Sequence, residues 1–331
     1  MTDRHPNAAL GRRGFAALAA GLFAAPSGLR AQGSWPDRPV RLIVPFGAGG
    51  AIDTLSRTVA NAFPAVAGGQ TLVVENRAGA GGTIAGQFVA QQRPDGTTLM
   101  MADLGANAIG RELNPRLPYD PMTAFTPICH LVNLPLVLAA PVSLPANDAP
   151  SLFALARERG ELPYAHPGVG YVGHLAHELM IRRANVRMVA VPYRSGAEML
   201  RSLVAAETTC GILTVSTTLP MIREGRVKAL AVLSPEPVPQ LPGVRPLAET
   251  LPGVVASVWH GIVGPAGMAP DLVAQINAVF NRIAEREEVR RSVEEVQAGR
   301  VVGGSAEAFA AFIRAEYERW APLIRDADIR V

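Results

Sequence analysis

Two short loops rich in glycine are the parts of this chain best suited to chemistry. The first runs from Phe46 to Asp53 and the second from Gly79 to Thr83. Each lies between a predicted strand and a predicted helix, so main-chain N–H groups at the start of the helix can converge on an anion. A carboxylate fits such a site, because no charged side chain is needed to hold it.

A nucleotide site is the competing interpretation of these loops. The first loop places Ile52 where a dinucleotide fingerprint requires glycine or alanine, and neither loop carries the Gly-Lys-Ser/Thr of a phosphate loop. Glu75, at the end of the second predicted strand, could hold a ribose. We therefore expect no cofactor, with Glu75 as the residue that keeps the nucleotide alternative open.

Other catalytic and metal-binding patterns are weaker. The chain has no Gly-x-Ser-x-Gly and no Ser-x-x-Lys motif. His174 and His177 are three residues apart on a predicted helix, but the His-Glu-x-x-His order of a zinc site is missing. We expect no metal site. The run Glu285–Glu295 is interleaved with arginines, which indicates a solvated helix surface.

The first residues have the order of an export signal. Of the 331 residues, 49% are hydrophobic and 18% charged, as in an ordinary globular chain. Arg12 and Arg13 precede an apolar stretch from Phe15 to Ala25, and the small residue Ala31 follows. The paired arginines resemble a twin-arginine signal. The stretch covers 11 residues, too few to cross a bilayer. We expect residues 1–31 to be cleaved during export.

The charge balance argues against a nucleic-acid partner. The formal net charge of +3 includes four arginines and one aspartate of the leader, and the remainder carries 27 basic and 27 acidic residues. A neutral body gives no electrostatic attraction to phosphates, and aromatic residues at 5% give few stacking surfaces.

The chain has two cysteines, Cys129 and Cys210. Their separation of 81 residues matches no metal or redox motif. A disulfide can form in an oxidising compartment. Both cysteines lie in apolar segments, so we favour two separate buried thiols.

Alternating strand and helix patterns position the glycine loops. We predict strands at 40–44, 71–75 and 97–101 with a helix after each glycine loop, the first beginning near Ile52 or Asp53. This order is typical of a parallel sheet with crossover helices. From Ser151 the alternation resumes, with strands at 163–165, 188–191, 211–215 and 227–233. Helical patterns at 272–283 and 309–320, the second capped by Ser305, predict two docking helices. Two similar α/β units predict two lobes with a site between them.

Several motifs together resemble the tripartite tricarboxylate transporter substrate-binding proteins, also called Bug receptors. They run in order from about residue 35 to the last helix, and none is specific alone. They are Trp-Pro-x-Arg-Pro-Val-Arg-Leu-Ile-Val-Pro-Phe-x-x-Gly-Gly-x-x-Asp at 35–53, Glu-Asn-Arg-x-Gly-Ala-Gly-Gly at 75–82, Pro-Asp-Gly-x-Thr-Leu at 94–99, Leu-Pro-Tyr-Asp-Pro at 117–121, Val-Pro-Tyr at 191–193, Ala-Leu-Ala-Val at 229–232 and Pro-Ala-Gly at 265–267.

The resemblance implies an α/β chain of the type II periplasmic binding protein fold, with two α/β lobes around a ligand cleft. It places lobe one at residues 34–130 plus 260–331 and lobe two at 131–259, joined by strands crossing at about 125–137 and 257–265. It implies a periplasmic receptor, not an enzyme, that traps a small organic carboxylate or amino acid. The receptor would pass it to membrane permease subunits or report it to a sensor kinase, and we expect a monomer. The alternative is an α/β enzyme acting on a small organic acid, with His166, His174 and Arg194 as catalytic candidates.

Members of this family hold a carboxylate largely through backbone amides and ordered water at the first two glycine loops. Asp53 is expected to cap its helix. The ligand-binding candidates that the resemblance implies are, from lobe one, Phe46, Gly49, Gly50, Ala51, Asp53, Gly81, Gly82, Thr83 and Asp103, and from lobe two, His166, Gly170, Tyr171, His174, Tyr193, Arg194 and Ser216.

Three positions depart from the family pattern. His166 and Tyr171 stand where most members have serine, and Thr209 stands where they have aspartate. These departures imply a ligand that differs from a simple dicarboxylate, flatter or smaller. Asp103 leaves two alternatives open. In the cleft it would favour an ammonium group and hence an amino-acid-like ligand, and otherwise it caps its loop and faces solvent.

Overall fold

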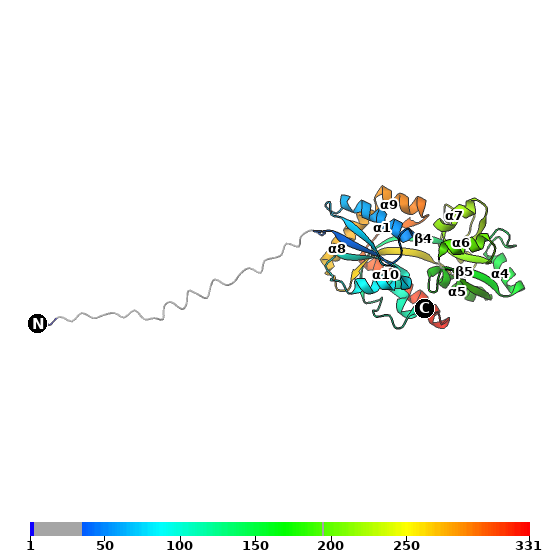
Figure 1. Cartoon of the computed structure of the whole chain (residues 1–331), viewed down its shortest axis with the longest axis horizontal. Coiled ribbons are helices and arrows are strands. Elements are labelled where there is room, and N and C mark those ends of the chain that lie inside the picture. The colour runs from blue at the N-terminus through cyan, green and yellow to red at the C-terminus, as the bar shows by residue number, and fades with distance from the viewer. Residues whose placement is uncertain (3–34, 194) are drawn as a thin grey trace. The chain divides into compact units, whose positions relative to one another are not determined.

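A computed structural model describes residues 1–2, 35–193 and 195–331 (Figure 1). The predicted export signal at 1–31 falls almost wholly outside the described residues. In the described part of the chain, no helix has the length and apolar character needed to span a bilayer.

The first sheet begins with three parallel strands, β1 (Val40–Val44), β2 (Leu72–Asn76) and β3 (Thr98–Ala102), in the order β2-β1-β3. Helices α1 (Ala51–Ala62) and α2 (Thr83–Ala90) connect them. The apolar runs of β1 and β3 are buried on both faces, as expected for strands inside a parallel sheet with helical crossovers. The predicted strands are confirmed to within one residue at each end.

Two antiparallel strands continue this sheet into a second one. The long strand β4 (Phe125–Pro141) pairs along its first part with β9 (Ser257–Pro265), and β9 also pairs with β3. From Leu136 onward β4 pairs instead with β7 (Cys210–Thr214) and β8 (Val227–Val232). The strand β4 therefore belongs to both sheets.

The second sheet repeats the parallel pattern. Its strands β5 (Leu162–His166) and β6 (Met188–Pro192) run parallel to each other, and β5 is also parallel to β7. The helices of this half are α4 (Ala149–Arg159), α5 (Val172–Ala184), α6 (Gly196–Val204) and α7 (Val215–Arg223).

Strand directions make the carboxyl ends of the two parallel sets face each other. Because β9 is antiparallel to both β3 and β4, β3 runs in the same direction as β4, whereas β7 runs opposite to β4. Ala102 at the end of β3 aligns through β9 with His130 of β4, and Thr214 at the end of β7 aligns with Leu136. Only the stretch between His130 and Leu136 separates the two edges, about 20 Å along an extended strand.

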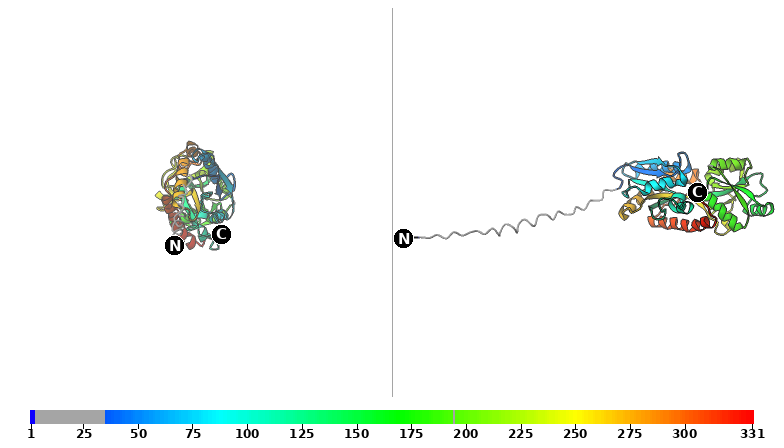
Figure 2. Two further views of the ribbon diagram at one scale, coloured as in Figure 1. Left: turned by 90° about the vertical axis from the view of Figure 1, so that its left-hand side faces the viewer. Right: turned by 60° about the horizontal axis from the view of Figure 1, so that its bottom comes forward.

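The remaining helices cover the first sheet. They include α8 (Pro270–Ala284), α9 (Glu287–Arg291) and the long α10 (Ala306–Asp326), which contacts β4, α8 and α5 (red in Figure 2). The predicted docking helices are confirmed, and Ser305 caps α10 by accepting a hydrogen bond from the Ala308 N–H at 3.2 Å. The shorter elements are η1 (Phe63–Ala65), η2 (Ala80–Gly82), η3 (Gly105–Ile109), α3 (Gly110–Leu113), η4 (Leu247–Glu249), η5 (Ser292–Val296) and β10 (Arg300–Val301).

The charged run at 285–295 is surface, as predicted, but it is not one regular helix. After α9 the backbone widens into the π-helical turn η5. Its exposed ion pairs join residues two or four apart, Arg286 with Glu288, Arg290 with Glu294 and Arg291 with Glu287.

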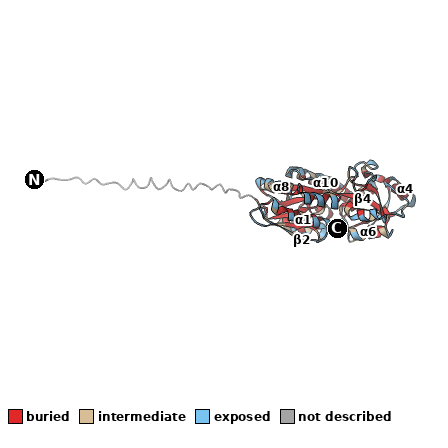
Figure 3. Ribbon diagram, turned by 90° about the horizontal axis from the view of Figure 1, so that it is seen from above, coloured by how far each residue is buried: buried red, intermediate tan, exposed pale blue. Residues whose placement is uncertain are grey.

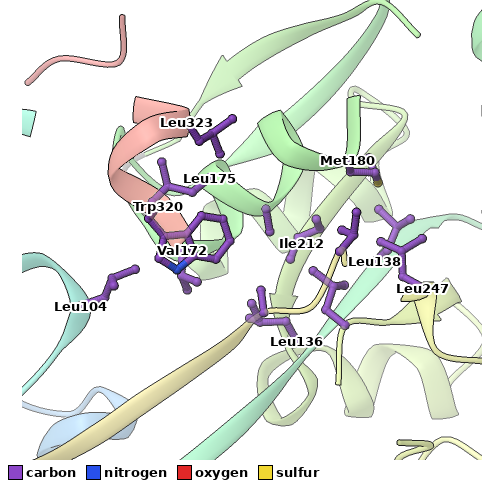
Figure 4. Packing of buried hydrophobic residues seen from close by; sticks show 14 of the residues in the cluster. Leu104, Leu136, Leu138, Val172, Leu175, Met180, Ile212, Leu247, Trp320 and Leu323 are labelled. Atoms are coloured by element: carbon purple, nitrogen blue, oxygen red, sulfur yellow. The ribbon is translucent and has the colours of Figure 1, made fainter. Parts of the chain in front are cut away.

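The core extends across both sheets. Buried residues line β4 and the inward faces of the helices (Figure 3). In the largest cluster, Leu136 and Leu138 of β4 meet Ile212 of β7, Leu175 of α5 and Trp320 of α10 (Figure 4). The two halves are therefore continuous through apolar packing as well as through β4.

A buried carboxylate connects α10 to the crossing strands. Glu316 accepts hydrogen bonds from the indole N–H groups of Trp259 at 3.2 Å and Trp320 at 3.1 Å, and it pairs with Arg319 at 3.0 Å. Both indoles are fully buried. Burial raises the pKa of Glu316, while Arg319 and the two indoles lower it. The carboxylate thus satisfies two donors that have no access to water.

We predict that Glu316→Ala lowers the free energy of unfolding by about 2–6 kcal/mol, because two buried indole N–H groups lose their partner and each costs about 1–3 kcal/mol when unpaired. The matched control is Glu318→Ala at an exposed position of the same helix, expected within about 0.5 kcal/mol of the parent. Urea unfolding followed by tryptophan fluorescence measures both. Equal losses in the two variants would show that Glu316 contributes no more than a surface residue.

Candidate functional site

Three loops of the first sheet meet at Gly82. Its φ of +89° favours glycine, and a Cβ there would lie 3.1 Å from the Pro45 Cβ and 3.3 Å from the Asp103 Oδ1. Pro45 follows β1, Gly82 begins α2 and Asp103 follows β3. The close approach therefore brings both glycine loops and the Asp103 loop together at the carboxyl edge of the sheet.

The helix α1 begins with amides that no side chain caps. Gly50 is its N-cap and, with Gly49 and Ala51, is exposed. The first amides of a helix have no partner within it. Phe46 is partly buried, and its carbonyl accepts a hydrogen bond from the Asn76 side chain at 2.9 Å. The start of α1 therefore offers free donors at the positive end of a helix dipole.

The carboxylate of Asp53 holds the first loop rather than facing outward. It accepts hydrogen bonds from the Gly49 N–H at 2.9 Å, the Asn76 amide at 2.9 Å and the Arg57 guanidinium at 3.0 Å. Arg57, supported by Gly49 and Asn76, holds the pKa of the buried Asp53 at about 2. The carboxylate bonds Gly49, one residue before the N-cap, so it holds the loop but does not cap α1 as expected.

The start of α2 also has no side-chain cap. Gly81 has φ +63°, and Gly82 is the N-cap. The hydroxyl of Thr83 donates to the Ala80 carbonyl at 2.8 Å, which fixes the side chain within the loop. The N–H groups of Gly82 and Thr83 donate to the carbonyls of Gly79 and Ala80 within this turn, so the start of α1 is the more open of the two helix starts.

Asp103 follows neither expectation fully. It caps its own turn, accepting from the N–H groups of Gly105 and Ala106 at 3.2 Å each, but it is buried instead of facing solvent. Its main-chain N–H donates to Asn107 at 3.1 Å. Burial raises the pKa of Asp103 to about 7, and the two amides only partly oppose this. The Asp103 side chain therefore stabilises the turn that packs beside Gly82.

In the second sheet and its helix α5, three histidines and a tyrosine form a buried stack. His166 of β5 and His174 of α5 are stacked with ring centroids 4.3 Å apart. Tyr164 lies against His177 at 4.4 Å, and the Nε2 of His177 is 3.8 Å from the thiol of Cys210. The Tyr164 hydroxyl donates to Glu178 at 2.6 Å. Both cysteines are free and buried, and burial raises the pKa of each thiol to about 12.

Backbone amides fix two of these rings. The N–H groups of Gly168 and Gly170 donate to the Nδ1 atoms of His166 and His174, each at 3.3 Å. Gly170, a candidate donor to ligand, therefore gives its N–H to His174. Burial lowers the pKa of His166, and it lowers the pKa of His174 to about 4. Both imidazoles are neutral at pH 7.

The other candidates of the second sheet have different surroundings. Tyr171 is the N-cap residue of α5 and packs its ring on the apolar core, and burial raises its pKa to about 12. The Tyr193 N–H donates to the His166 carbonyl at 2.8 Å. Ser216, one residue into α7, donates to the Thr214 hydroxyl at 3.4 Å. Arg194 lies outside the described residues.

Contacts connect the histidine loop to the second glycine loop. A Cβ on Gly110 would lie 3.3 Å from the Thr83 methyl group, and a Cβ on Gly170 would overlap the side chain of Leu113. Gly110 and Leu113 are the two ends of α3, a single helical turn. Both loops therefore pack against α3, one at each end of this short helix.

The alternatives to a carboxylate site find little support. Glu75, the ribose candidate, is taken by Arg41 and Arg77, each with a nitrogen at 2.6 Å. Among the described residues there is no cluster of three metal-ligating side chains. Two cavities, of about 380 and 440 Å³, lie elsewhere and share no residue with the candidate set.

Two residues of this region were missed by the sequence analysis. Asn76 bonds both Asp53 and the Phe46 carbonyl, although it appeared only as part of a motif. Tyr164 places its ring between His174 and His177 in the stack. Tyr164 lies two residues before His166 on a predicted strand, and alternate residues of a strand share a face, so the sequence could have placed the two side chains together.

Comparison with known proteins gives a consistent picture. Residues 55–329 match the model of the tripartite tricarboxylate transporter family receptor. BugT of Bordetella pertussis is 31% identical over 94% of this chain and 97% of its own. Rpa4515 of R. palustris, solved with adipate, is 31% identical with a TM-score of 0.79, over 90% of this chain and 100% of its own. MatC of Rhodopseudomonas palustris, with bound malate, is 30% identical with a TM-score of 0.74, over 87% and 99%.

We predict that stability falls between pH 6.5 and 4. Burial lowers the pKa of His130, His174 and His260 to about 4 and that of His177 to about 3, so over this range the unfolded chain binds protons that the folded chain does not. The raised pKa of Asp103 acts in the opposite sense, because its folded form is protonated from about pH 7 downward and its unfolded form only near 3.8.

The pKa of His166 is lowered too, and the raised pKa of Glu316 acts in the same sense as that of Asp103. Urea midpoints measured from pH 7 to 4.5 should therefore decrease, since five histidines outweigh two carboxyl groups. In Asp103→Asn the decrease should be steeper, because the opposing contribution is removed. A midpoint that is constant or rises on acidification contradicts the expected net proton uptake on unfolding.

Proposed function

Because the chain belongs to the tripartite tricarboxylate transporter receptor family, whose members are periplasmic solute-binding receptors, we propose that it binds a small carboxylate between its two sheets and performs no reaction on it. The observation that carries this proposal is the pair of helix starts without side-chain caps, α1 and α2, which follow the neighbouring strands β1 and β2 at one sheet edge, where Gly82 packs against Pro45. Amide dipoles at helix N-termini hold an anion without a cationic side chain.

The ligand then lies between two lobes, residues 34–130 plus 260–331 and residues 131–259. Support comes from the facing carboxyl edges of β3 and β7, across which a small molecule can touch both halves. A ligand that contacts both edges favours a closed arrangement by the difference between its affinities for closed and open forms. Adipate and malate, bound by Rpa4515 and MatC, are the first molecules to test.

Export and partners complete the proposal. Residues 1–31 act as a cleaved signal that delivers the receptor to the periplasm, where it works as a monomer. It hands the carboxylate to membrane permease subunits or reports it to a sensor kinase. The candidate enzyme residues His166 and His174 are engaged at Nδ1 by backbone amides, so the structure gives no particular support to catalysis.

The test is a binding screen joined to a turnover assay. Thermal unfolding is measured with adipate, malate, succinate and their amino-acid counterparts, and any ligand that stabilises the protein is titrated by calorimetry. A ligand at 100 times its Kd stabilises by about 2.7 kcal/mol. Mass spectrometry of the incubated ligand then checks for product. Binding without product supports a receptor, whereas product formation contradicts it.

We predict that Gly50→Leu lowers the affinity for the carboxylate at least tenfold and leaves folding intact. Gly50 has φ −79°, which any residue adopts, and a Cβ there meets nothing closer than the Gly47 carbonyl at 3.9 Å. The added side chain would cover the first amides of α1. Calorimetry measures the affinity, and Asn61→Leu at an exposed position near the other end of α1 is the matched control.

Unchanged binding in Gly50→Leu, with a normal melting temperature, would exclude the start of α1 from the site. Loss of binding in both leucine variants would point to a general effect of added apolar surface instead.

A further inference from the structure

A cavity of about 440 Å³ lies between α7 and the loop at 239–244, and it shares no residue with the proposed ligand site. Leu219, Ile222 and Arg223 line it from α7, and they share one face of the helix because they are three and four residues apart. Residues 239–242 and Val244 form the opposite wall. This α7 groove has the volume and the mostly apolar lining of a binding pocket.

The loop wall of the α7 groove is held in shape by its own backbone. The Leu241 N–H donates to the Val238 carbonyl at 2.9 Å, and the Val244 N–H donates to the Leu241 carbonyl at 3.2 Å. Pro239 and Pro242 restrict the backbone on both sides of Leu241. Leu241 itself is buried in an apolar cluster. A wall fixed in this way loses little conformational freedom when a partner docks on it.

The groove also carries an unpaired cation. Arg223 is exposed in the last turn of α7, and no carboxylate or carbonyl of the described residues accepts a hydrogen bond from its guanidinium. The helix dipole favours a cation at this end of α7, but it leaves the guanidinium donors without acceptors. By contrast, Arg245, just beyond the loop wall, pairs with Glu249. The α7 groove therefore combines an apolar lining with a free binding group for a carboxylate.

The loop wall borders the half of the molecule that is built on the first sheet. The Nε2 of Gln240 donates to the Glu294 carbonyl of η5 at 2.9 Å, and Ala298, just after η5, is buried in the same apolar cluster as Leu241. The Oε1 of Gln240 is buried without a donor, and both amide atoms of Gln297 are buried without partners in the part of the chain that the structure describes. This seam between the two halves is therefore incompletely hydrogen-bonded.

The cavity of about 380 Å³ lacks this combination of features. Its Asn277 amide is already bonded to the carbonyls of Ile128 at 2.7 Å and Gly304 at 2.8 Å, and its Ser305 caps α10. Its one charged lining residue is the acidic Glu307. Of these two cavities, the α7 groove alone offers an unpaired cation beside apolar side chains.

We propose that the α7 groove is the docking site for a membrane permease subunit, which inserts a segment with an apolar side chain next to a carboxylate. The apolar side chain fills the groove, and the carboxylate pairs with Arg223. This rests on the proposed receptor function and names the surface and the chemistry by which the partner binds. Because the loop wall borders the seam, a ligand that changes the relation of the two halves also changes the groove, so docking and ligand binding are coupled.

The first test uses cells that make the receptor together with its own permease. A photoreactive benzoylphenylalanine replaces Pro242, which is exposed in the groove, or Asn61, which is exposed on α1. Cross-linked peptides are identified by mass spectrometry. We expect a permease subunit joined to position 242 and not to position 61. The yield should differ by about twofold or more between cells with and without the carboxylate that calorimetry shows to bind.

Three results of this cross-linking would overturn the proposal. They are a product at position 242 that contains a second copy of the receptor or a sensor kinase, the absence of a permease product at that position, and equal permease products at both positions. Equal yields with and without the carboxylate would contradict the coupling through the seam.

The second test compares two charge reversals. Arg223→Glu should keep the calorimetric affinity for the carboxylate within about twofold, because Arg223 lies outside the ligand site. It should lower the rate of carboxylate uptake by cells about tenfold or more, because a like charge then faces the partner's carboxylate. Arg226→Glu makes the same charge change at an exposed residue that does not line the groove, and it should keep uptake within about twofold.

Normal uptake with Arg223→Glu, or an equal loss in both variants, would refute the docking site. Melting temperatures check that both variants fold, and the cross-linking experiment, in which Arg223 is unchanged, covers the case in which Arg223→Glu does not. If the parent protein binds no carboxylate at all, it is the proposed function that fails.

Discussion

Strand direction is the constraint on which the rest of this molecule depends. Because β4 is parallel to β3 but antiparallel to β7, the carboxyl ends of both parallel sets point toward the same stretch of β4. The helices α1, α2, α5 and α7, which follow those strands, then begin near that stretch, and no side chain caps their starts. The glycine loops, the Asp103 turn and the histidine stack are near one another because of this single topological fact.

The two edges use different chemistry. The first offers main-chain amides and keeps its carboxylates occupied, Asp53 by Arg57 and Asn76, and Asp103 by two amides of its own turn. The second carries the neutral imidazoles of His166 and His174, whose Nδ1 atoms already accept hydrogen bonds from backbone amides. Neither edge, as described, places a cationic side chain at these donors.

Much of this fold could be predicted from the sequence, because apolar runs bounded by glycine mark β1, β2 and β3 to within one residue. The apolar pattern alone did not give the extent of β4, since Pro127 and Pro135 divide it and such prolines suggest loops; only the family resemblance placed a crossing strand at about 125–137. The structure accommodates Pro127 beside a register shift in the pairing with β9. For the site, the glycine loops were recognisable from residue types. The burial of Asp103 and the hydrogen bonds from backbone amides to His166 and His174 were not, because they depend on loops folding back onto side chains.

The order of the elements along the chain has a consequence for biosynthesis. One neighbour of β3 is β9, which is made about 155 residues later, after the whole second sheet. Until then the free edge of β3 exposes unpaired amides next to apolar residues, a surface that invites wrong pairing. The first sheet can therefore be completed only after the strands of the second sheet have been made.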